Sequence, residues 1–112
     1  MAYDHELADR LRELLATEQD VLEQPMFGGL AFLISGNMSV SASGRGGLLV
    51  RVHPDDTDTL VDDKRVRLMV MGGRRMRGWL HVETTAEDDE LEQWVARGVT
   101  FARSLPAKSA RR

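Results

Sequence analysis

PMFGGLAFLISGNMSVSASGRGGLLVRV, residues 25–52, contains six of the ten glycines in this 112-residue chain, and the role of these glycines decides the fold. They separate short apolar runs, as in a phosphate-binding loop or in turns between strands. A Walker-type loop needs a lysine and a hydroxyl residue directly after its last glycine, and a dinucleotide loop needs G-x-G-x-x-G between a strand and a helix. Gly47 is followed by Leu48 and an apolar run. Turns in a sheet are therefore predicted.

Alternation of apolar and polar residues predicts three strands in this stretch. Their expected ranges are residues 29–35, 38–43 and 48–52. The side chains predicted to face the core are Leu30, Phe32, Ile34, Met38, Val40, Ala42, Leu48, Val50 and Val52. Ser39, Ser41 and Ser43 alternate with them, which is typical of a sheet with one wet face.

Glycine pairs and Gly-Asn mark the connections between these strands. Gly36 and Asn37 predict a two-residue hairpin turn, and residues 44–47 predict a second turn. Gly28 and Gly29 precede the first strand, where consecutive glycines fit either a bulge or a close approach of two backbones. Both alternatives stay open from the sequence.

The flanking segments predict three helices and two further strands. The expected helices cover residues 3–15 with Asp4 as the cap, a short segment from Pro54 to Val61, and a segment from a capping box at Thr84 or Thr85 to Pro106. The expected strands cover residues 65–71 and 76–82, with Val66, Leu68, Val70, Met76, Gly78, Leu80 and Val82 inward. Residues 22–26 are expected to be extended, because Pro25 disfavours helix.

These elements predict an α+β fold of two layers. We expect a mainly antiparallel, five-stranded sheet with the N- and C-terminal helices on one face, in the order α-β-β-β-α-β-β-α. A chain of this length forms one domain, expected over residues 1–108, and residues 109–112 are expected to be a disordered basic tail.

Composition limits the function. The chain has no cysteine, so disulfides, thiolate metal sites and a cysteine nucleophile are excluded. No apolar run is long enough to span a membrane, and charge begins at Asp4, so we expect no membrane contact, no signal peptide and a cytoplasmic location. The three histidines are scattered and the serines lie on a strand. We therefore expect no catalytic residue, metal or cofactor, and no enzyme.

One sheet face carries more apolar side chains than a wet face needs. The residues predicted to point away from the helices are Leu33, Leu49, Met69, Met71 and Trp79, with Arg51 beside them. An apolar patch of this kind often marks a contact with another protein. We expect a regulatory protein partner on this face, or a homodimer formed by this face or by an edge strand.

A basic segment offers an alternative function. Residues 64–77 contain six basic residues and no acids: Lys64, Arg65, Arg67, Arg74, Arg75 and Arg77. Basic residues beside an aromatic side chain such as Trp79 can bind single-stranded nucleic acid. The net charge of −3 makes nucleic-acid binding the second choice.

Five segments together resemble the TfoX N-terminal domain family, also called Sxy after regulators of natural competence. They are MFGG (26–29), GNM (36–38), LLVRV (48–52), RMRGWLHV (75–82) and WVARGVTFARSLPAK (94–108). The resemblance implies a small α+β domain similar to the secretion-chaperone-like class, with no known catalytic residue, metal or cofactor. In the competence regulators this domain precedes a second, C-terminal domain, and the whole regulator acts with a transcription factor of the cyclic-AMP receptor type. We expect a single-domain member that serves as a non-enzymatic regulatory module.

Overall fold

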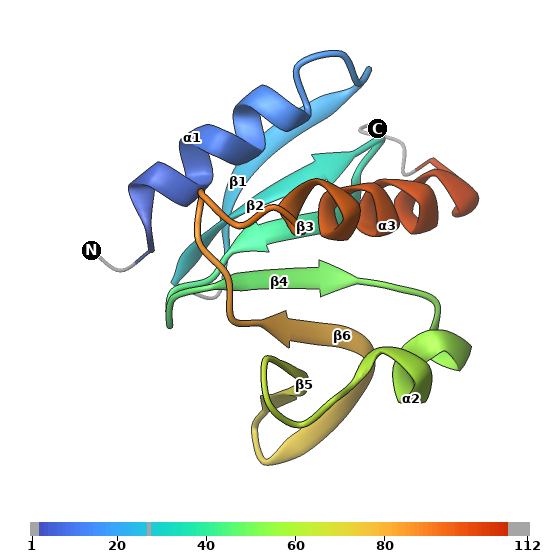
Figure 1. Ribbon diagram of the computed structural model, residues 1–112. Helices are drawn as coiled ribbons and strands as arrows, with labels where there is room; N and C mark the ends of the chain where they lie inside the picture. The colour runs from blue at the N-terminus through green and yellow to red at the C-terminus, as the bar shows by residue number, and fades with distance from the viewer. Residues whose placement is uncertain (1–2, 27, 108–112) are drawn as a thin grey trace.

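The computed structural model describes residues 3–26 and 28–107, which form one antiparallel sheet with helices on one face (Figure 1). Residues 1–2, 27 and 108 of the expected domain and the whole expected tail, residues 109–112, lie outside the described residues. The helices are α1 (His5–Leu14), the 3-10 turn η1 (Pro54–Asp56), α2 (Thr57–Leu60) and α3 (Leu91–Ser104). The strands are β1 (Val21–Met26), β2 (Gly29–Ile34), β3 (Asn37–Ala42), β4 (Leu48–Arg51), β5 (Val66–Met71) and β6 (Arg74–Val82).

The α+β class and the antiparallel sheet are confirmed, but the sheet has six strands in the order β1-β2-β3-β4-β6-β5. The prediction of five strands missed β1, which pairs with β2 from Val21 opposite Ile34 to Met26 opposite Gly29. Its middle residues are exposed, so β1 carries no alternating apolar pattern. Pro25 is compatible with this strand because β1 is an edge strand.

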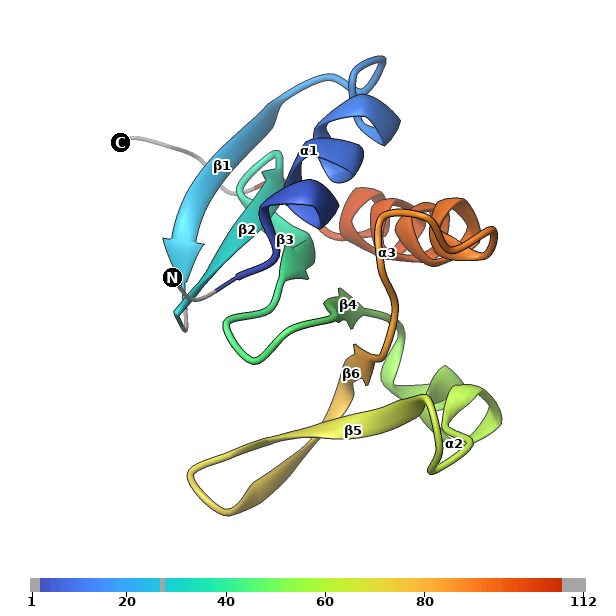
Figure 2. The ribbon, with the colours of Figure 1, turned by 60° about the vertical axis from the view of Figure 1, so that its left-hand side comes forward.

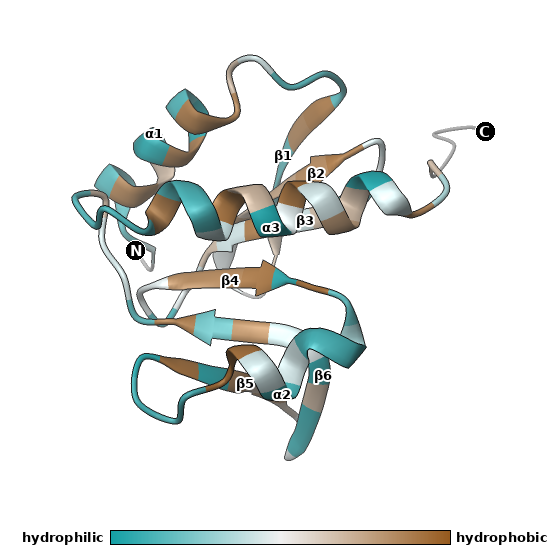
Figure 3. Cartoon of the chain, turned by 45° about the vertical axis from the view of Figure 1, so that its right-hand side comes forward, coloured by the Kyte–Doolittle hydropathy of each residue, from teal (hydrophilic) through white to brown (hydrophobic). Residues whose placement is uncertain are grey.

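Helices α1 and α3 lie on the same face of the sheet, and the β5–β6 hairpin extends beyond them (Figure 2). The main core lies between these helices and the sheet. It contains the predicted inward residues of β2 and β4 together with Leu7, Leu11, Leu91 and Trp94 from the helices. Figure 3 shows apolar and polar residues alternating along α3, as expected for a helix that buries one side.

Local capping explains where α1 begins, while α3 begins later than predicted. Asp4 Oδ1 accepts hydrogen bonds from the backbone N–H of Glu6 and Leu7, which confirms the predicted cap. The capping box at Thr84 or Thr85 is wrong, because α3 begins at Leu91. The Thr84 hydroxyl instead donates to Asp88 Oδ2 at 2.6 Å within the preceding loop.

The hairpin between β2 and β3 is confirmed, but its turn is one residue earlier than predicted. Ser35 and Gly36 have positive φ angles of 50° and 85°, while Asn37 is already in β3. Two consecutive positive φ angles characterise the turn type that matches strand twist. Asn37, which was predicted to lie in the turn, is buried in β3, and its Nδ2 donates to the Pro106 carbonyl at 3.0 Å.

A bulge at Ser39 corrects two further predictions. Leu33 pairs with Met38 but Phe32 pairs with Val40, so Ser39 is an extra residue in β3. Its hydroxyl donates to the Phe32 carbonyl at 2.8 Å. Because of the extra residue, Met38 lies on the opposite face from Val40 instead of in the main core.

The serines predicted to form a wet face are buried. Ser39, Ser41 and Ser43 are 0%, 2% and 5% exposed. Both faces of β3 are therefore covered, one by the helices and the other by neighbouring side chains of the sheet. The prediction of one wet face is wrong for this strand.

Gly29 and Gly44 allow two backbones to approach closely. A Cβ on Gly29 would lie 2.1 Å from the Ala42 carbonyl oxygen, and one on Gly44 would lie 2.7 Å from the Gly28 carbonyl oxygen. Of the two roles left open for Gly28-Gly29, the close approach is the one observed.

A second irregularity bends β6. Leu68 pairs with Leu80, but Met69 pairs with Met76, so residues 77–79 have no direct partners in β5. Met76 therefore shares the face of Met69, opposite to its predicted direction. Val70, predicted to be in the core, is 47% exposed because its part of the hairpin extends beyond the helices.

Candidate partner-binding surface

The sheet face opposite α1 and α3 carries a second apolar cluster, here called the outer cluster. Its buried members are Ala31, Met38 and Leu49, and its partly buried members are Met26, Leu33, Met69 and Trp79. Side chains alternate between the two faces of a strand, so Ala31, Leu33, Leu49 and Trp79 are each next to a residue of the main core. The predicted directions of Leu33, Leu49, Met69 and Trp79 are confirmed.

The solvent-accessible part of this face differs from the expected patch. Leu49 is 5% exposed and therefore belongs to the interior, whereas Leu33, Met69, Met71 and Trp79 are partly exposed. Leu22 pairs with Leu33 and is 61% exposed, so β1 extends the apolar surface to the edge of the sheet. This extension is missed by the prediction, because residues 22–26 are expected to be extended but not to pair as a strand of the sheet.

Arg51 lies between two aromatic rings at the end of β4. Its guanidinium carbon is 5.0 Å from the Trp79 ring centroid and 5.3 Å from the Phe101 ring centroid. Desolvation lowers the pKa of Arg51 from its ordinary value, although the group stays charged at neutral pH. Among the described residues, no acidic side chain forms an ion pair with Arg51. The cation is therefore held in place by aromatic contacts.

A groove of about 470 Å³ borders the outer cluster along β5. Its apolar lining includes Leu49, Met69 and Met71, and its polar lining includes Arg45, Arg67 and His81. His81 is held in position because its Nε2 lies 2.7 Å from the Gly46 carbonyl oxygen. Methionine side chains adapt their shape easily, which suits a surface that contacts another protein.

The structure separates the six basic residues of 64–77 into two groups. Three of them have acidic partners: Arg65 contacts Asp88, Arg67 lies 3.8 Å from Glu83, and Arg77 lies 3.4 Å from Asp58. Arg77 also donates to the Pro54 carbonyl, which directs it toward η1.

The other three basic residues are exposed, and no ion pair involves them within the described part of the chain. They are Lys64, Arg74 and Arg75. Lys64 precedes β5, whereas Arg74 and Arg75 follow the hairpin turn at the other end of that strand. The segment therefore does not form one continuous cationic surface, and nucleic-acid binding stays an untested alternative.

Asp88 anchors the loop before α3 and makes stability depend on pH. The Thr84 hydroxyl is the main cause that lowers the pKa of Asp88 below its ordinary 3.8, followed by the Glu90 backbone N–H, with Arg65 also contributing. A lowered carboxyl pKa stabilises the fold above pH 3.8. This contribution disappears as the pH falls through the lower pKa of the folded state.

Asp88→Asn is therefore expected to lower the free energy of unfolding by about 1 kcal/mol at neutral pH and by less in acid. The measurement is urea unfolding at a series of pH values from neutral to about 2, compared with wild type. Asp89→Asn is the matched control, because Asp89 is exposed in the same loop. An equal difference between wild type and Asp88→Asn at every pH would contradict the proposed linkage.

Metal-ligand clusters and membrane-spanning helices are both absent from the described residues. Within residues 3–26 and 28–107, no three histidine or acidic side chains gather as metal ligands. Also within these ranges, no helix is long and apolar enough to cross a membrane. The hydroxyl of Ser39 donates to the Phe32 carbonyl. The hydroxyl of this buried serine therefore stabilises the bulge between β2 and β3.

Comparison of the sequence with models of protein families finds a match. The sequence model described as the TfoX N-terminal domain matches residues 13–102, which is most of the chain. Neither the comparison with curated proteins nor the comparison with solved structures found a match. The matched residues include the whole sheet and most of α3.

Proposed function

Because the chain belongs to the TfoX N-terminal domain family, we propose that it is a non-enzymatic regulatory module that binds protein in the cytoplasm. Membership of this family supports the regulatory role, because the family is similar to the competence regulators. The partly exposed outer cluster supports protein binding, because apolar side chains on a sheet face are stabilised when a partner excludes water from them.

The outer cluster has the composition of a protein contact. Trp79 and Arg51 lie together, and these two residue types are enriched where single side chains contribute most to binding. Leu22 and Leu33 add exposed apolar surface beside them, across β1 and β2. A second copy of the chain is the simplest occupant, because one patch then serves both partners of a twofold dimer.

The Trp79→Glu variant is expected to bind at least about tenfold more weakly than the wild-type chain does, both to a second copy of the chain and to a protein partner. The change places a carboxylate in an apolar contact, where desolvation opposes binding. Immobilised wild-type and variant chains are compared for retention of added untagged chain and of proteins from a native lysate. Light scattering then tests the dimer against the 12.6 kDa monomer mass.

Thr100→Glu is the matched control, because Thr100 is exposed on α3, which covers the opposite face of the sheet. The proposal predicts that this variant retains the same proteins as wild type. Equal retention by wild type and Trp79→Glu would overturn the outer face as the binding surface. If the chain is a monomer but still retains a protein partner through Trp79, the dimer is refuted and partner binding at the outer face stands.

A further inference from the structure

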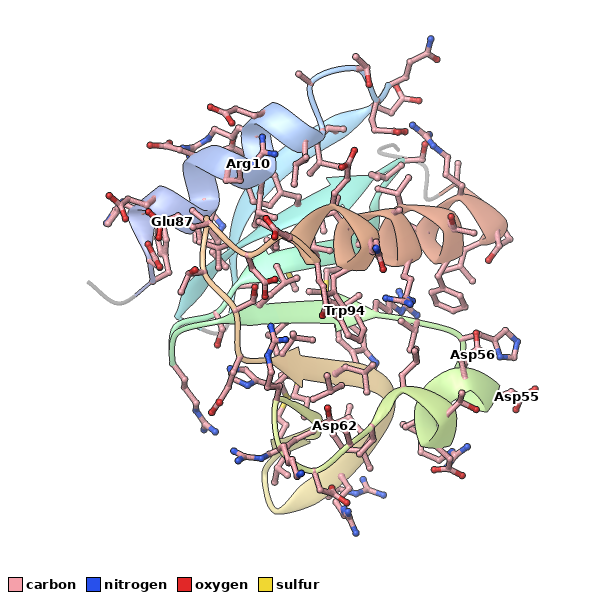
Figure 4. The ribbon with its side chains drawn as sticks, viewed as in Figure 1. Arg10, Asp55, Asp56, Asp62, Glu87 and Trp94 are labelled. Carbon is pink, nitrogen blue, oxygen red and sulfur yellow. The ribbon has the colours of Figure 1, made fainter. Side chains whose placement is uncertain are left out.

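Strand β5 forms an edge of the sheet that is closed at its first residue and open further along. The Val66 N–H donates to Asp62 Oδ1 at 2.9 Å, and the Val66 carbonyl accepts from the N–H groups of Asp62 and Asp63, both at 3.1 Å. Figure 4 shows Asp62 close to this strand. Val66 therefore directs its backbone groups away from β6, into the turn before β5.

Leu68 and Val70 direct their backbone groups the same way, because alternate residues of an antiparallel strand share one direction. Within the described residues, no side chain or loop backbone forms a hydrogen bond with these two residues. Their N–H and carbonyl groups are therefore available to another strand.

The opposite edge of the sheet is less receptive. Pro25 in β1 has no N–H to donate. Glu23 in the same strand is tied to α1, because Arg12 Nε lies 2.6 Å from its Oε2. Proline and charge are common means by which proteins protect an edge strand. The open backbone of β5 is the exception.

Charge and side-chain alternation indicate what fits beside β5. Lys64, Arg74 and Arg75 flank the outer part of this edge, are exposed and form no ion pair within the described part of the chain, so two β5 edges from two copies would repel one another. An acidic strand would be attracted.

Leu68 and Val70 offer apolar contacts on one face, with Val70 47% exposed. Arg67 lies on the other face, and its contact with Glu83 is long, at 3.8 Å, and exposed, so an acidic residue of an added strand can compete for it. A strand with alternating apolar and acidic residues matches both faces.

We propose that β5 receives an extended segment of a partner protein, with alternating acidic and apolar residues, as an added strand of the sheet. This proposal rests on the proposed function and names the kind of segment that the module binds. Nucleic acid fits this edge less well, because phosphates accept hydrogen bonds but cannot donate to the carbonyl groups of Leu68 and Val70.

The test uses a fluorescein-labelled heptapeptide in which glutamate and valine alternate, with fluorescence anisotropy as the readout. The wild-type chain is expected to bind it, and Val70→Pro is expected to weaken binding by at least about tenfold. Proline removes the outward N–H of Val70 without removing a hydrogen bond to β6, which is the position where an edge strand accepts proline. Hydrogen exchange at the amides of Leu68 and Val70 is expected to slow when the peptide binds.

Val70→Thr is the comparison variant, because threonine keeps the N–H and the branched shape but loses part of the apolar contact, and it is expected to weaken binding less than Val70→Pro does. No binding at millimolar peptide, or equal binding by Val70→Pro, would overturn the proposal. Binding of oligothymidylate that competes with the peptide and does not respond to Val70→Pro would overturn it in favour of nucleic acid. Retention of lysate proteins that depends on Trp79 but not on Val70→Pro would refute strand addition and leave the proposed function standing.

Discussion

Phe32→Ala is expected to lower the free energy of unfolding by about 3–5 kcal/mol, a large part of the stability of a domain of this size. Phe32 is 1% exposed on β2 and is one of the largest fully buried side chains. It lies between Glu23 of β1 and Val40 of β3 in the strand register, so the cavity would open in the middle of the first three strands. Neighbouring strands cannot close it without breaking their pairing.

Urea unfolding followed by circular dichroism measures the change in midpoint and slope. Leu22→Ala is the matched control, because Leu22 is 61% exposed in the adjacent strand and is expected to change stability by less than about 0.5 kcal/mol. A loss below about 1 kcal/mol for Phe32→Ala would show that this part of the core can rearrange, contrary to its packing here.

Gly98→Val is expected to destabilise the fold by about 1–3 kcal/mol, although valine favours a helix more than glycine does. A Cβ at Gly98 would lie 2.6 Å from the Ser39 carbonyl oxygen and 2.8 Å from Val40 Cγ1. Neither contact can be relieved by rotating a flexible side chain, because one atom is backbone and the other belongs to a buried valine. Helix α3 would have to move away from β3.

Thermal and urea unfolding of Gly98→Val are compared with those of Ala96→Val. Ala96 is exposed on the same helix, so its substitution reports the helix propensity of valine without a clash. We expect Ala96→Val to lose less than about 1 kcal/mol. If the two variants were equally stable, the close contact between α3 and the bulge of β3 would be refuted.

Those parts of the fold that depend on local sequence could be predicted. Leu48, Val50 and Val52 face the core because alternation in a buried strand follows directly from side-chain geometry. Asp4 caps α1 because a short carboxylate before a helix accepts from the first free N–H groups. Both inferences require only neighbouring residues.

Those parts that depend on distant pairing could not be predicted. Strand β1 is held by β2 and has mostly exposed side chains, so its sequence lacks the pattern that identifies strands. The bulge at Ser39 adds one residue to β3 without changing its composition, and this alone moves Met38 to the outer cluster.

In the candidate surface, too, features that follow from local sequence could be predicted and features that depend on distant residues could not. The outward directions of Leu33, Met69 and Trp79 followed from alternation, but the burial of Leu49 depends on neighbours brought in by the whole sheet. The pairing of Arg65 with Asp88 joins residues far apart in the chain. Charge patterning in the sequence therefore identified a basic segment without showing which of its cations are already paired.

The unequal edges of the sheet set a limit on how far assembly can proceed. Unlimited growth of a fibre requires each added unit to offer a second edge that accepts the next unit. Here β5 is open, while β1 carries Pro25 and the Arg12–Glu23 ion pair. Each chain therefore offers one open edge for an added segment, and binding there is expected to saturate at one segment per chain. The same asymmetry removes the second open edge that a growing stack of these chains would need.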